Sequence, residues 1–192
     1  MIVKYITDTQ TYLDNFAKCK ATNDSVLLIG TTTNLTVYDT GRKDINYEEC
    51  AKENAVIIPM TSNGGAAVTL PGDIGFYFSN HSYIAGWCKY IFAELQRWLS
   101  SRGVLTTFRN NDLAIYGKKF AGYTEHPSKN YSFGIIFIAM NNAQDYVNKF
   151  FTKAKTKETI GLRDFGLIAD EIIQVVIKAT KNYLMFVKES DK

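Results

Sequence analysis

The most regular pattern in the chain lies between Tyr83 and Gly103, where apolar residues recur every three or four positions. That spacing predicts an amphipathic helix, and Gly103 stands where a helix C-cap is expected. The apolar side of this helix consists of Ile84, Trp87, Ile91, Leu95 and Trp98.

Helical spacing or composition also predicts helices over 9–20, 45–54, 142–154 and 168–186. Asn141 or Asn142 is the expected N-cap of the third, because a side-chain oxygen there can accept a hydrogen bond from the first turn. The first and last of these helices have apolar sides made of Tyr12, Leu13, Phe16 and Ala17, and of Ile168, Ile172, Ile173, Val176 and Ile177.

Short β-rich runs between the helices predict strands. They cover 25–30, 34–39, 55–59, 66–70, 73–79, 104–108, 113–116, 119–124 and 133–140. The runs 66–70 and 73–79 are expected to pair around the turn at Pro71 and Gly72, and the last four runs to form a meander. Runs of strands with helices between them predict an α+β sandwich, a mixed and mostly antiparallel sheet with helices packed on it.

Composition then narrows the class of protein. The 192 residues, 46% hydrophobic and 21% charged, predict one globular domain over 1–192. The net charge of +3, from scattered basic residues, gives no reason to expect a nucleic-acid partner, and no apolar run is long enough to span a membrane.

The expected location is the cytoplasm. The first residues lack the apolar core of a signal peptide, and Cys19, Cys50 and Cys88 have no spacing typical of a metal site or a disulfide framework. They are therefore expected to be reduced thiols. The abundance of Asn, Lys, Tyr, Phe and Ile fits an AT-rich source such as a low-GC bacterium or a virus, and for a virus the location would be the host cytoplasm.

The first candidate site is the glycine-containing segment "TSNGGAAVTLPGDIGFYFS" at 61–79. Gly64 and Gly65 would let a ligand approach the backbone, whose N–H groups can bind phosphate. The segment has neither the Gly-Lys-Ser/Thr of a P-loop nor a Gly-x-Gly-x-x-Gly fingerprint. The alternative is a turn whose glycines only let two strands cross.

The second candidate is "NDLAIYGKKFAGYTEH" at 111–126. Lys118 and Lys119 follow Gly117 in a tight turn, where lysines are also common at exposed hairpin tips. Strand alternation would turn one of them to the inner face of the sheet, where it could bind a phosphate. Asp112 could hold Mg²⁺ together with water and phosphate oxygens.

Together the two segments resemble the biotin/lipoate protein ligase superfamily. The second resembles its Asn-Asp-(x)4-Gly-Lys-Lys-(x)-Ser/Ala-Gly signature, and "NGGAAVTLPGDIGFYFS" is similar to its glycine loop. The order also agrees: the glycine loop, a long helix, the lysine hairpin and then the strand "GIIFIAMN". The resemblance covers roughly Val26 to Leu167, most of the chain.

This resemblance implies a class II synthetase-like sandwich and an ATP-dependent ligase. Such an enzyme joins lipoate, octanoate or biotin to ATP as an acyl adenylate, then passes the acyl group to a lysine of a carrier domain. By position, Lys119 matches the catalytic lysine. The nucleotide- and acyl-binding positions are Gly64, Gly65, Ala66, Asn111, Asp112 and Gly122, and Asp112 is also the expected Mg²⁺ ligand.

The chain departs from the family's pattern in several places. Lipoate ligases usually carry arginine before the glycine loop, but this chain has Pro59, Met60 and Thr61 there, and Asn63 replaces one glycine. The nucleophilic cysteine of octanoyltransferases is absent, since Thr107 and "KTKETIGLRDFG" stand at its two positions. From the length of 192 residues, neither an accessory C-terminal domain nor a DNA-binding N-terminal domain is expected.

Two functional alternatives remain open at this point. One is a stand-alone ligase that uses ATP and Mg²⁺ and modifies a carrier domain. The other is a non-catalytic relative (a pseudoenzyme), kept as a structural module that binds a protein partner. The intact lysine hairpin favours the first, and the missing arginine favours the second.

Overall fold

A computed structural model describes residues 1–6, 25–41, 45–59, 66–80, 86–126, 132–152 and 157–190, with side chains up to 187. Several predicted features lie outside these ranges. They are the helix over 9–20, the start of the long helix with Ile84, and Cys19, Met60, Thr61, Asn63, Gly64 and Gly65.

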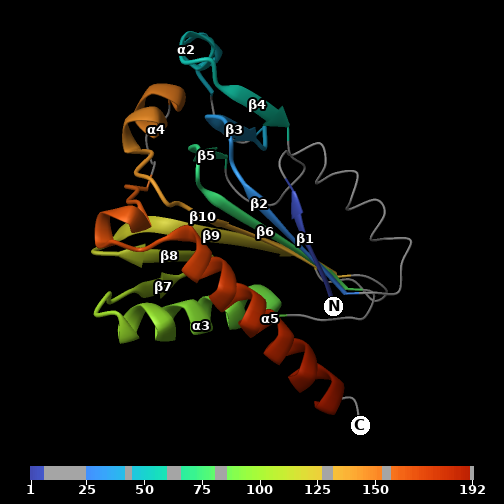
Figure 1. Ribbon diagram of the computed structural model, residues 1–192. Helices are drawn as coiled ribbons and strands as arrows, with labels where there is room; N and C mark the ends of the chain where they lie inside the picture. The colour runs from blue at the N-terminus through green and yellow to red at the C-terminus, as the bar shows by residue number, and fades with distance from the viewer. Residues whose placement is uncertain are drawn as a thin grey trace.

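A seven-stranded sheet forms the centre of the molecule (Figure 1). In spatial order its strands are β1 (Ile2–Ile6), β2 (Val26–Thr31), β6 (Ile74–Asn80), β10 (Ser132–Ile138), β9 (Lys118–His126), β8 (Asp112–Ile115) and β7 (Thr107–Arg109). Only β1 and β2 run parallel, and all other neighbours are antiparallel. The mostly antiparallel sheet and the meander from β7 to β10 are therefore confirmed.

Two helices, α3 (Trp87–Ser101) and α5 (Ala169–Ser190), cover one face of this sheet and pack on each other. Their apolar sides and the facing strands form the main core, with Phe76, Phe92 and Leu95 almost fully buried. The predicted end of α3 is confirmed. Arg102 is the C-cap residue, and Gly103 directly after it has a φ of 78°, in the left-handed region.

A second, three-stranded sheet lies on the other side of the large one (Figure 1). Its order is β4 (Val56–Pro59), β3 (Thr36–Asp39) and β5 (Ala67–Thr69), with β3 parallel to β4 and antiparallel to β5. Helices α2 (Tyr47–Lys52) and α4 (Gln144–Phe150) pack near it around Val37, Cys50 and Phe150. A short 3-10 helix, η1 (Leu162–Phe165), leads into α5.

Three details of the prediction are wrong. The runs around Pro71 and Gly72 do not pair, because β5 joins β3 in the small sheet while β6 pairs with β2 and β10. The turn therefore carries the chain from one sheet to the other, with Gly72 at a φ of 91°.

The other two concern helix ends. Ile168 precedes α5 and is 56% exposed, so it does not belong to the apolar side. Ala143 is the N-cap residue of α4, although the Asn142 Oδ1 still accepts a hydrogen bond from the Gln144 N–H at 3.0 Å. The two cysteines in the described ranges, Cys50 and Cys88, are buried free thiols as expected. No described helix is both long and apolar enough to cross a membrane.

Candidate active site between the two sheets

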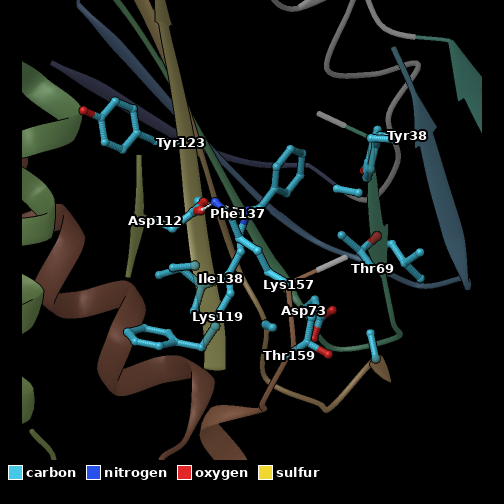
Figure 2. A pocket seen from close by; sticks show the side chains of 18 of the residues that line it. Tyr38, Thr69, Asp73, Asp112, Lys119, Tyr123, Phe137, Ile138, Lys157 and Thr159 are labelled. Atoms are coloured by element: carbon cyan, nitrogen blue, oxygen red, sulfur yellow. Dashed lines mark hydrogen bonds and ion pairs between the residues drawn. The ribbon is translucent and has the colours of Figure 1, made fainter. Parts of the chain in front are cut away.

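A cavity of about 460 Å³ lies between the two sheets, on the face of the large sheet opposite to α3 and α5 (Figure 2). Strands β3 and β5 line one side, and β8, β9 and β10 line the other. The sequence-predicted residues Ala66, Asn111, Asp112, Lys119 and Gly122 all line this cavity. Ala66 directly follows Gly64 and Gly65, whose own positions are not described.

A bulge in the β8–β9 hairpin decides which side chains face the cavity. Asp112 pairs with Gly122 and Leu113 with Ala121, but Ala114 pairs with Lys119, which leaves Phe120 as an extra residue. Without this bulge, strand alternation would place residues 119 and 122 on opposite faces. With it, both lie on the side of Asp112, and Phe120 is buried in the core.

The hairpin turn is a second local reason for this geometry. Tyr116 and Gly117 have φ values of 51° and 78°. Two successive positive φ values are typical of the two-residue turns that match the twist of a hairpin. Lys118 and Lys119 therefore begin β9 at a fixed register.

The Asp112 carboxylate holds two lysines at the cavity. Lys119 Nζ lies 2.7 Å from Asp112 Oδ1, and Lys157 Nζ contacts Asp112 Oδ2. Burial raises the pKa of the Asp112 carboxyl, but its ion pairs with Lys119 and Lys157 outweigh burial and hold that pKa below its ordinary value. The carboxylate is therefore ionised at neutral pH, and the three groups together carry one net positive charge.

Lys118 differs from Lys119 in its surroundings. It is exposed, and its Nζ lies 3.3 Å from Glu158 Oε2. Of the two lysines, Lys119 is therefore the one that faces inward.

Glycine at 122 leaves space for the lysine tip. A Cβ atom there would lie 2.7 Å from Lys119 Nζ and 3.1 Å from Asp112 Oδ1. Both distances are too short for ordinary contacts, so any larger residue would push the lysine away from Asp112.

Lys157 is a cavity residue that sequence reasoning missed. The segment 157–160 is fixed to β9 by two backbone hydrogen bonds, from Lys119 N to Glu158 O at 2.7 Å and from Ile160 N to Lys119 O at 3.0 Å. The Thr159 N–H also donates to Gln144 Oε1 at 2.7 Å. These contacts join distant parts of the chain, and no local pattern around Lys157 signals them.

Asp73 fixes the turn between β5 and β6. Its Oδ1 accepts hydrogen bonds from the N–H groups of Met140 and Asn141 at 2.8 and 3.1 Å, and its Oδ2 accepts one from Leu70 at 2.8 Å. Burial raises the pKa of Asp73 to about 6, although these hydrogen bonds and Arg163 favour the charged form. The carboxylate thereby ties the glycine segment to the end of β10.

The expected Mg²⁺ at Asp112 does not fit the arrangement as it stands. Both carboxylate oxygens are already engaged by ammonium groups. In the described part of the chain, no group of three or more His, Cys, Asp or Glu side chains could hold a metal ion. Asp112 is ion-paired with two lysines, and its expected role as a Mg²⁺ ligand stays a prediction. Thr107, the residue at one family cysteine position, is exposed on the edge strand β7.

Comparison with solved structures identifies the fold. LipL1 of P. falciparum in complex with lipoate matches with a TM-score of 0.76 and 16% identity, covering 95% of this chain and 62% of that chain. A bi-partite lipoate protein ligase from Thermoplasma acidophilum, studied with its E2 lipoyl domain, matches at 0.79 and 14%, covering 96% and 83%. The biotin protein ligase from Aquifex aeolicus in complex with biotin and ATP matches at 0.56 and 16%, covering 98% and 71%.

This chain has the lipoate/biotin protein ligase fold. No protein-family model matches its sequence, and no curated protein does either. The chain spans 62% of the length of the Plasmodium protein. The sequence resemblance and the fold class are therefore confirmed at the level of the ligase fold, while the roles expected for Lys119, Asn111, Asp112 and Gly122 stay predictions.

Proposed function

We propose that this chain is an ATP-dependent acyl-protein ligase. It would join a carboxylic acid of the lipoate, octanoate or biotin type to ATP and pass the acyl group to a lysine of a carrier domain. The observation that carries the proposal is the ion-paired Lys119, which lines a cavity between the two sheets of a ligase fold. The cavity extends to Ala66, next to the paired glycines.

Electrostatics support a role in acyl adenylation. When the carboxylate oxygen of the acid attacks the α-phosphorus of ATP, negative charge develops on phosphate oxygens and pyrophosphate leaves. A fixed ammonium group in a site with little water stabilises that charge strongly. Asp112 keeps Lys119 in place and Gly122 leaves room for its tip. Asn111, which also lines the cavity, is the proposed partner of Asp112 at the nucleotide.

Lys157 offers a replacement for the missing arginine. It lines the same cavity from a different segment and shares Asp112 with Lys119. Two ammonium groups can bind two oxygens of one phosphate, as a guanidinium fork does, although without its planar geometry. The loss of arginine near residue 61 therefore does not leave the cavity without a second cation.

Apolar side chains make up much of the remaining wall. Phe137 and Ile138 of β10, and Val147 of α4, line the cavity and suit a hydrocarbon chain. The bound ligands of the neighbours point the same way, since the Plasmodium protein is bound to lipoate and the Aquifex ligase to biotin and ATP. The carrier domain is proposed by analogy with the Thermoplasma ligase and its lipoyl domain.

The test is ATP–pyrophosphate exchange with lipoate, octanoate and biotin. Lys119→Ala is expected to lower the exchange rate by about 100- to 1000-fold, because it removes one charge stabiliser of the transition state. Lys118→Ala is the matched control, since Lys118 is the adjacent exposed lysine, and it should leave the rate unchanged. No exchange and no thermal shift with any acid plus ATP would overturn the proposal and leave the non-catalytic alternative.

A further inference from the structure

The segment 157–160 pairs with β9 along one of its edges. The Lys119 N–H donates to Glu158 O at 2.7 Å, and the Lys119 carbonyl accepts a hydrogen bond from the Ile160 N–H at 3.0 Å. In such a parallel pairing, the residue between the two bonded positions turns its own N–H away from the partner strand. That residue is Thr159, which lies opposite Lys119. Its N–H therefore needs an acceptor from another part of the chain.

Gln144 of α4 supplies this acceptor. Its Oε1 accepts from the Thr159 N–H at 2.7 Å, and its Nε2 donates to Asn148 Oδ1 at 2.8 Å, one turn further along α4. Asn142 gives a second contact, since its Oδ1 accepts from Thr159 Oγ1 at 3.1 Å and from the Gln144 N–H at 3.0 Å. The residues at the start of α4 thus hold Thr159 by its backbone and by its side chain.

The position of Thr159 bears on the direction of Lys157. Side chains two residues apart in an extended segment project to the same side, and Thr159 and Lys157 both line the cavity. The Lys157 ammonium contacts Asp112 (Figure 2). Because the Lys157 side chain is 61% exposed, its direction depends on the backbone that carries it and on this ion pair.

We propose that Gln144 is a positioning residue for the second cation of the cavity. Gln144 is not one of the described residues that line the cavity, so it acts through the segment 157–160. It keeps this segment where the Lys157 ammonium reaches both Asp112 and a phosphate oxygen of the nucleotide. Helix α4 then serves two parts of the site, because its Val147 lines the wall proposed for the acyl chain. This inference rests on the proposed function.

Binding of an ATP analogue tests the proposal on the full chain. The probe has a methylene group between its α- and β-phosphates, so it binds without releasing pyrophosphate, and calorimetry measures its affinity. Lys157→Ala is expected to weaken binding by about tenfold through the loss of one charged hydrogen bond. Gln144→Met removes the acceptor and keeps the side-chain length. It should weaken binding by about three- to tenfold, because a displaced cation loses no more than a missing one. Gln144→Glu retains an acceptor oxygen and should bind the analogue more tightly than Gln144→Met, although it adds a negative charge.

A double variant separates positioning from a merely structural role. In the Lys157→Ala background, Gln144→Met should cause no further loss of affinity, because the group that Gln144 positions is gone. A structural role would weaken binding equally in both backgrounds. Gln96→Met is the matched control. Gln96 on α3 is also partly buried, and its Nε2 donates to a backbone carbonyl, Thr106 O, at 3.4 Å on the opposite face of the large sheet. This control should leave the affinity unchanged.

Hydrogen exchange without nucleotide follows the contact itself. In Gln144→Met, the Thr159 amide should exchange at least about tenfold faster, because its acceptor is removed. The Leu162 amide, which donates to Ala139 O at 3.1 Å, should keep its rate. Asn142→Ala removes the second contact with Thr159 and should weaken binding of the analogue in the same way but less, which tests the proposal even where Gln144→Met fails to fold.

The outcomes separate this inference from the proposed function. Unchanged binding by Gln144→Met, or an equal loss in the wild-type and Lys157→Ala backgrounds, would overturn the inference even where pyrophosphate exchange proceeds. A Lys157→Ala variant that binds as tightly as the wild type would also overturn it, and the proposed function would then rest on Lys119 alone. Absence of nucleotide binding by the wild type would overturn the inference and the proposed function together.

Discussion

Two glycines on neighbouring strands of the large sheet leave space on opposite faces. Gly134 on β10 leaves space for helix α3, and Gly122 on β9 leaves space for the Lys119 side chain. A Cβ atom at Gly134 would lie 2.7 Å from Cys88 Sγ and 2.8 Å from Trp87 Cε3, in the core under α3. A Cβ atom at Gly122 would meet the tip of Lys119 in the cavity. One glycine allows close packing of a helix on the sheet, and the other allows a charged side chain to keep its position.

The polar groups of the two faces differ in the same way. Under the helices, Glu125 accepts hydrogen bonds from the N–H groups of Gly86 and Cys88 at 3.0 and 3.1 Å, at the start of α3. Trp87 Nε1 donates to Thr180 Oγ1 at 3.2 Å. On the cavity side, Asp112 forms ion pairs with Lys119 and Lys157. The polar groups of the helix-covered face therefore join helices to strands and to each other by hydrogen bonds, while those of the cavity face form a cluster of one carboxylate and two ammonium groups.

The largest expected effect concerns pH and the cavity-side carboxylate of Asp73. Its pKa is about 6 in the folded protein and near the ordinary 3.8 when unfolded. Because the folded pKa is the higher one, the stabilising contribution is complete below about pH 4 and is lost as pH rises through 6. A shift of about two units corresponds to roughly 3 kcal/mol in the free energy of unfolding.

Denaturant unfolding between pH 4 and pH 7 measures this effect. The difference between the wild type and Asp73→Asn should shrink across that interval, because asparagine does not titrate. Asparagine also has a single acceptor oxygen for three N–H donors, so the variant starts from a lower stability at pH 4. A constant difference from pH 4 to pH 7 would contradict the raised pKa.

The next effect compares the two glycines directly. Gly134→Ala should lower the free energy of unfolding by about 1 to 3 kcal/mol, because the added methyl group meets a rigid indole ring and a buried thiol. Gly122→Ala should change it by less than about 1 kcal/mol, because the flexible lysine tip can move aside. Its pyrophosphate exchange should fall at least about tenfold, since Lys119 is misplaced. Equal losses of stability would remove the contrast between the two faces.

The smallest effect concerns the second cation of the cavity. Lys157→Ala should weaken binding of the acid in the presence of ATP by about tenfold, the amount typical of one lost charged hydrogen bond. The free energy of unfolding should change little, because the Lys157 side chain is 61% exposed. Calorimetry compares this variant with Lys118→Ala, for which no change in affinity is expected. Identical affinities would leave Lys119 as the working cation without help from Lys157.

Most elements of the fold could be predicted because they depend on local periodicity. The apolar spacing of α3 and α5 and the buried run of β10 are encoded within each segment. The assignment of β5 and β6 to different sheets could not be predicted in this way. Pro71 and Gly72 signal a turn, but whether its two strands pair depends on partners far away in the sequence, here β3, β2 and β10.

In the candidate site, too, the residues of a local pattern could be predicted and those brought in by distant contacts could not. Asn111, Asp112, Lys119 and Gly122 stand within twelve residues, so their pattern is visible in the sequence. Lys157 and Thr69 reach the cavity only through contacts with distant parts of the chain, and neither residue belongs to a recognisable local pattern. The bulge at Phe120 is also invisible to simple alternation, which assigns residues 119 and 122 to opposite faces.

Because of that bulge, the pairing of β8 with β9 decides which residues of β9 face the cavity. Removing the single residue Phe120 would leave Lys119 and Gly122 two positions apart, so regular alternation would still place both on the side of Asp112. A strand of unchanged length without the bulge would instead turn Lys119 to the opposite face. Replacing Phe120 by another apolar residue would keep the count and the register. The position of Lys119 in the cavity therefore depends on the match between the number of residues before Gly122 and the pairing of β8 with β9.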